Sequence, residues 1–443
     1  MSGNRFNLII KKTDISVFFL TLLCVTFLSP LILRTIGTVG VLALAAVYFL
    51  LEADHLFHIN IQEKNTLILI GLYVAMLLLY TFLGKSDEGA GQTGAVLFMI
   101  SFILIIPIYK RLNKKHCIFI IAACTATIMI TLFQNYLLYV RLGNRISQQL
   151  YKVGYKEVVN TQYVSALMLF SGVLFSVFLC EPKKLVKFGA LFITAVCFGF
   201  NILVTQRAIT TILSFVLFFL LILVKGEMSK KKIIRYIIFL LLIMLLFLQY
   251  DAIIGFVADL FDSPRLKSRF DSILGFLSTG SIDNVEEGSL TVRIRLIGVS
   301  IKTFWSSISN FLFGVGEKID YSVVGNHSQF FDEFAKFGIF GGLLSCTIFI
   351  KMSKIAKRIS TIEKNDYHYK MLTVIFVVMV MRALIGGVFS PPIGIIMFIF
   401  MPISFKVMKL NLIEKKEGMI KHENLRFDST SLGTGEWRED ISL

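Results

Sequence analysis

Apolar stretches long enough to cross a lipid bilayer recur along almost the whole chain. A helix needs about 17 to 25 predominantly apolar residues to cross the hydrocarbon core. About twelve stretches approach or meet this length: 15–34, 36–51, 66–83, 94–109, 117–140, 161–180, 187–205, 209–224, 233–250, 330–350, 371–389 and 391–408. The sequence therefore predicts an all-α polytopic membrane protein with about twelve transmembrane helices.

The composition excludes an ordinary soluble domain, because 56% of the 443 residues are hydrophobic and only 17% are charged. The first apolar stretch is full length and follows Lys11 and Lys12. It has no small-residue cleavage site, so we expect a membrane anchor rather than a cleaved signal peptide. All six Cys fall inside predicted helices as small apolar side chains, with no disulfide framework or zinc spacing.

Basic residues alternate from one predicted loop to the next. The formal net charge is +16, and Lys-rich loops lie at residues 110–115, 183–187, 225–235 and 351–358. These loops all fall on one side of the membrane, which the positive-inside rule makes the cytoplasmic side. Both termini are predicted to be cytoplasmic as well. A loop-by-loop distribution of this kind reflects orientation in the membrane and argues against a nucleic-acid partner.

The external side carries mostly arginine rather than lysine. The external arginines are Arg34, Arg141, Arg145, Arg207, Arg265, Arg269, Arg293, Arg295 and Arg382. A guanidinium group grips phosphate with two N–H groups at once and does not deprotonate, which a lysine ammonium cannot match. External arginines are therefore candidates for binding an anionic substrate.

The chain divides into four parts. Residues 1–250 hold the first nine predicted transmembrane helices, and residues 251–329 form a large external loop. Residues 330–408 hold the last three helices. Residues 409–443 form a polar cytoplasmic tail without periodicity, which we expect to be disordered.

Two segments of the large external loop have helix-like patterns. In residues 293–308, apolar side chains recur at offsets of three, four and seven, namely Ile294, Ile297, Ile301, Phe304, Trp305 and Ile308. This pattern predicts an amphipathic helix that lies in the external membrane interface. Residues 265–277 show a weaker version of the same pattern.

Two arginines lie at the membrane rather than in loops. Arg207 ends the seventh apolar stretch, just before the eighth. Placing an arginine at a helix centre costs roughly 2.5 to 3.5 kcal/mol on insertion scales, so Arg207 either binds a substrate or snorkels to the interface as an anchor. Arg382 lies inside the eleventh stretch, on the external side of the midplane. It is expected to face a polar cavity, and an internal ion pair is the alternative.

His327 stands where the external loop meets the tenth stretch, in the string Gly325-Asn326-His327-Ser328-Gln329-Phe330-Phe331-Asp332. An imidazole at a boundary between water and lipid can accept a proton near neutral pH. The simpler interpretation is a helix-capping or interface residue. Asp332 lies five residues later, about one and a half helical turns away, so it is expected to play a secondary role.

Cofactor-binding patterns are absent from the sequence. There is no glycine-rich loop ending in Lys-Ser or Lys-Thr, so ATP-driven transport is disfavoured. His55 and His58 lie near Glu52 and Asp54, but a solvated cytoplasmic loop explains this group better than a metal site. We therefore expect no metal and no other cofactor.

Several motifs occur in a fixed order in the second half of the chain. These are Thr205-Gln206-Arg207-Ala208 at a helix end, Arg293 before an amphipathic helix, Gly314-Val315-Gly316, and His327-Ser328 followed after nine residues by Gly338-x-x-Gly341. In this order the chain resembles the O-antigen polymerase and O-antigen ligase superfamily over about residues 200–345. It departs from the pattern at Gln206, where relatives often have Ser, and at Lys336, where they have an acidic residue. Arg295 is also basic where many relatives are not, which leaves open whether Arg293 or Arg295 is the matching residue.

The resemblance implies a metal-independent glycosyltransferase of the bacterial inner membrane that acts at its periplasmic face. Its substrate would be an oligosaccharide carried on undecaprenyl diphosphate. Arg207 and Arg293 or Arg295, with Arg382, would bind the diphosphate, and preorganised guanidinium groups would stabilise charge on the departing phosphate. His327 would accept the proton of the attacking hydroxyl. Partners would be membrane lipid, with a chain-length regulator and a flippase of the same pathway.

Two other functions remain open beside a polymerase of polysaccharide repeat units, which is favoured. A ligase that moves finished polysaccharide to lipid A-core shares the same motifs. A lipid-linked oligosaccharide flippase or another secondary transporter also has about twelve spans. Transporters show related halves and broken helices at the midplane, whereas the charges here collect at one face and in one loop.

Overall fold

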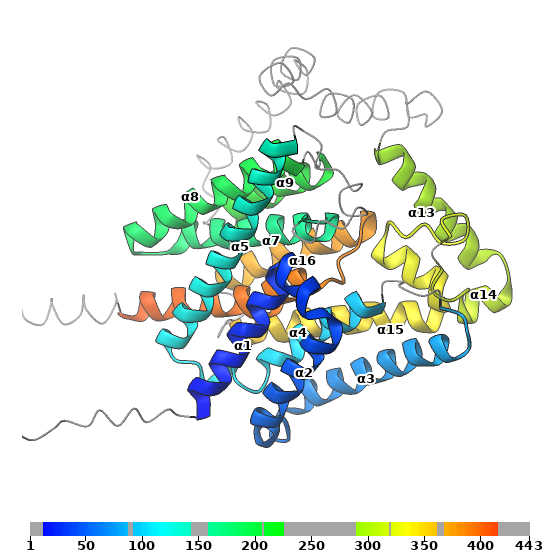
Figure 1. Cartoon of the computed structure of the whole chain (residues 1–443), viewed down its shortest axis with the longest axis horizontal. Coiled ribbons are helices and arrows are strands. Elements are labelled where there is room, and N and C mark those ends of the chain that lie inside the picture. The colour runs from blue at the N-terminus through cyan, green and yellow to red at the C-terminus, as the bar shows by residue number, and fades with distance from the viewer. Residues whose placement is uncertain are drawn as a thin grey trace, which may run out of the picture.

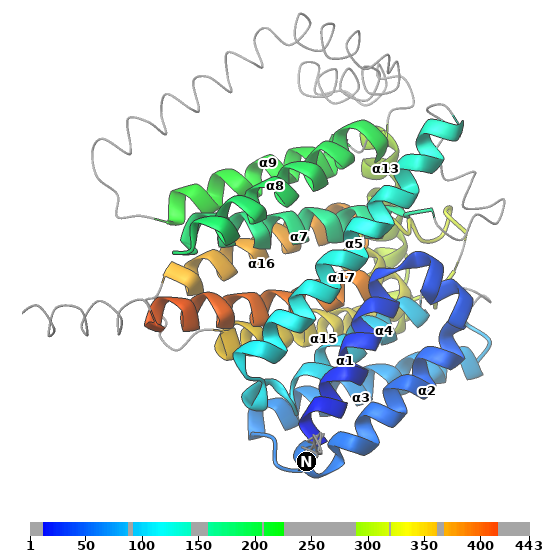
Figure 2. The same ribbon diagram turned by 60° about the vertical axis from the view of Figure 1, so that its left-hand side comes forward.

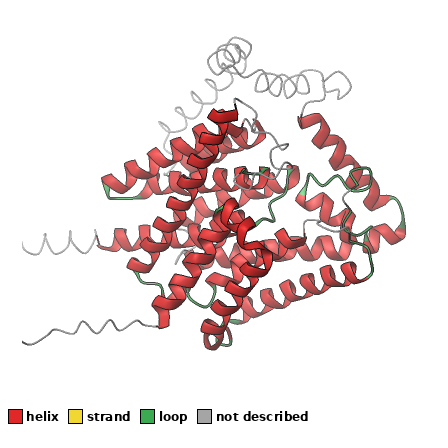
Figure 3. Cartoon of the chain, viewed as in Figure 1, coloured by secondary structure: helices red, strands yellow, loops and turns green. Residues whose placement is uncertain are grey.

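The computed structural model describes residues 12–86, 92–142, 158–205, 208–225, 289–318, 320–360 and 367–414. The regular elements in these ranges are all helices (Figure 3). The one extended pairing found there is an isolated parallel bridge between Ser86 and Glu317. The predicted all-α fold is confirmed for these ranges.

Figure 1 shows the helices in chain order. They are α1 (Lys12–Leu28), α2 (Pro30–Leu56), α3 (Ile61–Phe82), α4 (Gln92–Ile105), α5 (Lys114–Leu142), α7 (Thr161–Cys180), α8 (Lys184–Phe200), α9 (Ala208–Val224), α13 (Ser289–Trp305), α14 (Ile308–Phe313), α15 (Gln329–Ser360), α16 (Tyr367–Ile385) and α17 (Pro391–Ile395). A 3₁₀ turn occupies Tyr109–Arg111, and π-helical turns occupy Asn201–Thr205 and Ile396–Phe400. The segment that α17 begins stays helical to Glu414, past the predicted end of the last span.

Seven helices of the described ranges are long and apolar enough to cross a membrane. They are α2, α3, α5, α7, α15, α16 and the segment Pro391–Glu414, and the apolar helices α4 and α9 are shorter. The chain is therefore a helical membrane protein. The ninth predicted stretch, 233–250, lies outside the described residues, and the total of about twelve spans stays a prediction.

The boundary between the first two predicted spans is wrong. The break comes at Ser29 rather than after residue 34, because Pro30 begins α2 and Ser29 accepts a hydrogen bond from the backbone N–H of Ile32 at 3.3 Å. Proline suits the first turn of a helix, and serine caps it. A kink at Gly37 lies close to the predicted boundary and interrupts α2 instead.

Helix α13 occupies most of the predicted amphipathic stretch but ends at Trp305, where Ser307 caps the separate helix α14. Its buried side chains are Leu296, Ser300 and Phe304. The predicted apolar residues Ile301, Trp305 and Ile308 are exposed instead. They form an apolar outer surface next to the bundle. The weaker pattern at 265–277 lies outside the described residues.

One end of the bundle gathers lysine-rich segments, and we name it the lysine end. The first turn of α5 contacts both ends of the described chain, because His116 lies 2.8 Å from Asp14 and Lys114 lies 2.5 Å from Glu414. Lys183, just before α8, lies 4.0 Å from the same Glu414 carboxylate. The first and last described helices therefore have their outer ends on the same side of the bundle.

The core of the bundle lies around α7 and the segment Pro391–Glu414, which are mostly buried within the protein. Figure 2 shows α7 inside the bundle, where it contacts α8, α9 and α16. Helices α2 and α3 lie at the edge and expose large apolar side chains such as Leu50 and Phe82. An apolar exterior around a packed centre suits a helical bundle in lipid.

Candidate functional site

The loop between α16 and α17 brings two predicted site residues together. Arg293 of α13 donates a hydrogen bond from Nη1 to the carbonyl oxygen of Ile385, at the end of α16, at 2.8 Å. Arg382 of α16 lies against Gly386 so closely that a side chain at position 386 would collide with its guanidinium group. Guanidinium groups from two different helices therefore contact adjacent residues, Ile385 and Gly386.

Arg382 is only 2% exposed, although it lies within an apolar helix. Its Nε donates to the hydroxyl of Ser165 in α7 at 2.9 Å. Burying an arginine in a membrane helix is costly unless polar groups surround it. The charge is thus held at the junction of α7, α16 and the 385–387 loop, inside the protein.

Arg295 and Arg207 are not part of this arrangement as described. Arg295 follows Arg293 by two residues, which turns it to another side of α13, and it is exposed. Arg207 lies outside the described residues, directly after the π-helical turn Asn201–Thr205. The structure therefore places Arg293, and not Arg295, at the end of α16. The sequence had left open which of the two belongs to the site.

The backbone around His327 is held in an unusual conformation. Asn326 has a φ of 54° and is the one non-glycine residue with a positive φ in the described part of the chain. Its side-chain amide donates to the carbonyl oxygens of Lys318 at 2.8 Å and Val324 at 3.3 Å. Such conformations persist where surrounding contacts enforce them, and they concentrate at functional sites.

The imidazole of His327 is half-buried and has a defined orientation. Its Nδ1 lies 2.9 Å from the carbonyl oxygen of Gly325, and its ring lies edge-on to Tyr321 with the ring centroids 5.9 Å apart. A carbonyl oxygen only accepts hydrogen bonds, so this contact places a proton on Nδ1. In the neutral ring, Nε2 then carries the lone pair and can act as a base.

The capping role considered for His327 belongs to its neighbours. Ser328 Oγ accepts from the backbone N–H of Phe331 at 3.3 Å, and Asp332 Oδ2 accepts from the backbone N–H of Ser328 at 2.8 Å. Asp332 Oδ1 also accepts from the hydroxyl of Ser300 in α13 at 2.5 Å. Asp332 therefore fixes the start of α15 against α13. Its partner Ser328 is the residue that directly follows His327.

The glycine motifs form a close backbone contact. Gly338, with a φ of 64°, kinks α15, and a Cβ there would overlap the carbonyl group of Leu312. Gly314, with a φ of 69°, meets the carbonyl of Lys336 in the same way. Gly316 N–H donates to that carbonyl oxygen at 2.8 Å. The nine residues between Ser328 and Gly338 are thus a short helical segment clamped at its far end.

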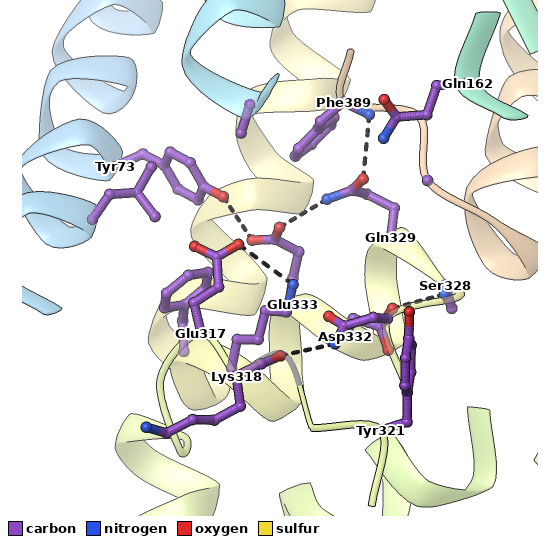
Figure 4. A pocket seen from close by; sticks show the side chains of 16 residues that line it. Tyr73, Gln162, Glu317, Lys318, Tyr321, Ser328, Gln329, Asp332, Glu333 and Phe389 are labelled. Carbon is purple, nitrogen blue, oxygen red and sulfur yellow. Dashed lines mark hydrogen bonds and ion pairs between the residues drawn. The ribbon is translucent and has the colours of Figure 1, made fainter. Parts of the chain in front are cut away.

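A cavity of about 280 Å³ lies beside the start of α15 (Figure 4). Its walls come from six parts of the chain: Tyr73, Leu77, Ala95, Gln162, Glu317, Lys318, Tyr321, Asn326, Ser328, Gln329, Asp332, Glu333, Lys336, Phe337, Gly387 and Phe389. Both chain neighbours of His327 line the cavity, and Gly387 joins it to the loop that holds the arginines. The cavity and the arginines are therefore parts of one region.

Polar side chains that the sequence did not single out line this cavity. Glu333, 4% exposed, accepts from the hydroxyl of Tyr73 at 2.8 Å and from the amide of Gln329 at 2.8 Å. Gln329 in turn accepts from the backbone N–H groups of Val388 and Phe389, each at 3.2 Å. An acidic residue at the start of an apolar helix was the available signal for Glu333.

Lys336 has a partner in the structure. Its Nζ lies 3.6 Å from Oε1 of Glu317, which is 4% exposed.

Within the described ranges, no group of three or more His, Cys, Asp or Glu side chains could hold a metal ion. What the region offers is guanidinium groups, an imidazole with a basic nitrogen, and a polar cavity.

Comparison with models of known protein families finds no match for this chain. No curated protein matches it either. Function is therefore argued from the site, where guanidinium groups suit phosphate and a polar cavity suits a hydroxylated ligand.

Proposed function

We propose that the chain is a polymerase of O-antigen or a related surface polysaccharide. In this proposal it transfers the growing glycan from undecaprenyl diphosphate to the next lipid-linked repeat unit, at the periplasmic face of the bacterial inner membrane. The observation that carries the proposal is that Arg293 contacts Ile385 and Arg382 contacts Gly386, next to the loop that holds His327. The motif order of the sequence points the same way.

The arginines act on the donor. Arg293 reaches the loop from α13 and Arg382 from α16, which concentrates two permanent charges in a largely dehydrated place. Preorganised donors of this kind stabilise charge as it develops on a leaving diphosphate. Arg207 is a further proposed diphosphate contact, whereas Arg295, which is exposed on another side of α13, is not. The polyprenyl tail stays in lipid beside the apolar outer helices.

His327 acts on the acceptor. The acceptor hydroxyl oxygen attacks the anomeric carbon of the donor sugar, and the bond from that carbon to the diphosphate oxygen breaks. The hydroxyl proton passes to Nε2 of His327, and undecaprenyl diphosphate leaves with the bonding electron pair. The Gly325 carbonyl oxygen supports this role by holding the other ring nitrogen at 2.9 Å.

A ligase that transfers polysaccharide to lipid A-core would catalyse the same kind of glycosyl transfer, whereas a flippase would catalyse no glycosyl transfer. Gene deletion separates the three. Loss of a polymerase leaves single repeat units on lipid A-core, and loss of a ligase leaves polymer on the lipid carrier. Loss of a flippase traps repeat units inside the cell. Purified protein incubated with lipid-linked repeat units and no lipid A-core should make long products if it is a polymerase.

Both termini are proposed to lie in the cytoplasm, with the lysine end inside. In a variant without native Cys, a Cys at Ser322 should react with a membrane-impermeant thiol reagent in intact spheroplasts. A Cys at Lys184 should react only after permeabilisation. Both positions are exposed in the structure, so a reversed pattern would place the site region in the cytoplasm. The proposed use of a lipid carrier at the periplasmic face would then be wrong.

A further inference from the structure

One carboxylate oxygen in the cavity is buried without a partner. Glu317 is 4% exposed, and its Oε1 faces Lys336. Its Oε2 is buried and accepts no hydrogen bond from any residue that the structure describes. Buried carboxylate oxygens are costly to leave unsatisfied, so each such atom calls for an explanation.

The position of Glu317 is fixed by the backbone on both sides. Gly316 donates its N–H to the carbonyl oxygen of Lys336, and Glu317 forms the isolated bridge with Ser86, four residues after the end of α3. Figure 4 shows the carboxyl groups of Glu317 and Glu333 turned toward the same space beneath Tyr73. Both oxygens of Glu333 already accept hydrogen bonds. Of these two carboxyl groups, Glu317 is therefore the one with an oxygen that has no hydrogen-bond partner among the described residues.

The charge of the cavity selects the chemistry of its ligand. Three carboxylates line it, from Glu317, Asp332 and Glu333, against the two ammonium groups of Lys318 and Lys336. An acidic sugar would meet like charge, whereas a hydroxyl or amino group could donate a hydrogen bond to the unpartnered oxygen of Glu317. Tyr321 and Phe389 add aromatic surface to the walls.

The size of the cavity limits the ligand further. Pockets for drug-sized ligands have volumes of roughly 300 to 1,000 Å³, so about 280 Å³ suits one sugar ring rather than an oligosaccharide. The ring would lie beside the loop of His327, because Asn326 and Ser328 line the same cavity. A sugar in the cavity would therefore lie next to both chain neighbours of His327, although the His327 side chain itself does not line the cavity.

We propose that this cavity is the acceptor-sugar subsite, and that it binds an uncharged or amino sugar through a hydrogen bond donated to Oε2 of Glu317. Glu317 is then a binding residue that positions the acceptor ring. The assignment rests on the proposed function, because it divides the substrate between the cavity, which takes the acceptor glycan, and the arginines, which take the donor diphosphate.

The test measures glycan binding without the diphosphate. The probe is the repeat-unit oligosaccharide released by mild acid from the lipid-linked intermediates that accumulate in the deletion strain. Its affinity for the full chain in nanodiscs is measured by saturation-transfer NMR titration. Glu317→Gln is compared with the double variant Glu317→Gln/Lys336→Met, which removes both charges of the buried pair and leaves no unpaired ammonium.

Glu181→Gln is the matched control, because Glu181 is also 4% exposed and accepts from Asn411 near the lysine end at 3.0 Å. We expect binding at least about tenfold weaker in both Glu317 variants, as for loss of a hydrogen bond to a charged group. Glu181→Gln should bind as the unsubstituted protein does. Arg293→Ala should also bind the free oligosaccharide normally while losing affinity for the lipid-linked form.

Equal binding by the unsubstituted protein and both Glu317 variants overturns the subsite. An unsubstituted protein that polymerises lipid-linked units but shows no saturable binding of the released oligosaccharide overturns it too. Failure of the proposed function is seen separately, since a deletion strain with normal polysaccharide length and no accumulated lipid-linked units rules out the polymerase itself.

Discussion

The two ends of the helical bundle use charge in opposite ways. At the lysine end several ion pairs are exposed, as in Lys12 with Asp54, whose side chains are 51% and 77% exposed, although Glu52 is buried against Arg111. At the opposite end the charged groups are buried, with Arg382 at 2% and Asp332 at 5% exposure. Exposed pairs contribute little to stability, whereas buried charges are costly unless other groups satisfy them.

This difference indicates that the lysine end sets the orientation of the protein in the membrane, whereas the opposite end holds the candidate site. Lysines at the lysine end need only lie on one side of the membrane, so no particular partner is required. The charged groups at the opposite end have defined partners on several helices, such as Ser165 for Arg382 and Ser300 for Asp332. Single substitutions should therefore be severe at the site end and mild at the lysine end.

The largest effect is expected at His327. His327→Ala removes the proposed base and should lower the rate of polymerisation by about 100- to 10,000-fold, the usual contribution of general base catalysis. The measurement is product formation by purified protein from lipid-linked repeat units. The matched control is His116→Ala at the lysine end, where the imidazole contacts Asp14. Equal rates for the two variants at equal protein levels would remove His327 from the mechanism.

The next effect distinguishes two arginines on one helix. Arg293→Ala should lower the rate by roughly 100- to 1,000-fold, as for loss of one preorganised donor to a developing anion. Arg295→Ala should cause a much smaller loss, because this exposed side chain points to another side of α13. Initial rates with the same lipid-linked donor decide the order. A more severe Arg295 variant would show that the substrate binds on the outer surface of α13.

The sequence predicts elements set by local pattern well. The stretch 161–180 coincides with α7 (Thr161–Cys180), since Asn160 caps the helix by accepting from Tyr163 N–H at 2.8 Å. The imidazole of His327 was also placed correctly at the entrance of a helix. These features depend on residues within one or two turns of each other, which a single sequence contains.

Features that depend on packing between distant segments could not be predicted. Tyr73 and Glu333 share a hydrogen bond although 260 residues separate them. The choice between Arg293 and Arg295 depends on how α13 is rotated against the bundle, and both are basic in the sequence. The ion pair between Lys336 and Glu317 joins α15 to the loop before it, and no local pattern in the sequence indicates it. The cavity is formed by residues from six distant parts of the chain, so no local pattern in the sequence could predict it.

A smaller effect, on stability, is expected at the glycine contact. Gly338→Ala should destabilise the protein by about 1 to 3 kcal/mol, because the residue has a positive φ and its Cβ would overlap the backbone of Leu312. The measurement is thermal unfolding in detergent. Gly71→Ala in α3 is the control, since a Cβ there meets nothing within 4 Å. Equal unfolding temperatures would mean that the kink in α15 is not required.

The smallest effect is expected for the exposed pair at the lysine end. Lys114→Gln and Glu414→Gln break the contact between the first turn of α5 and the last described helix. Because the Glu414 side chain is 53% exposed, water replaces the lost partner, and we expect unchanged unfolding temperature and unchanged product length. Many other lysines also remain to set the orientation. If either substitution slowed polymerisation as His327→Ala is expected to do, the two ends would not differ in function, and the buried charges near α15 would not mark a separate site.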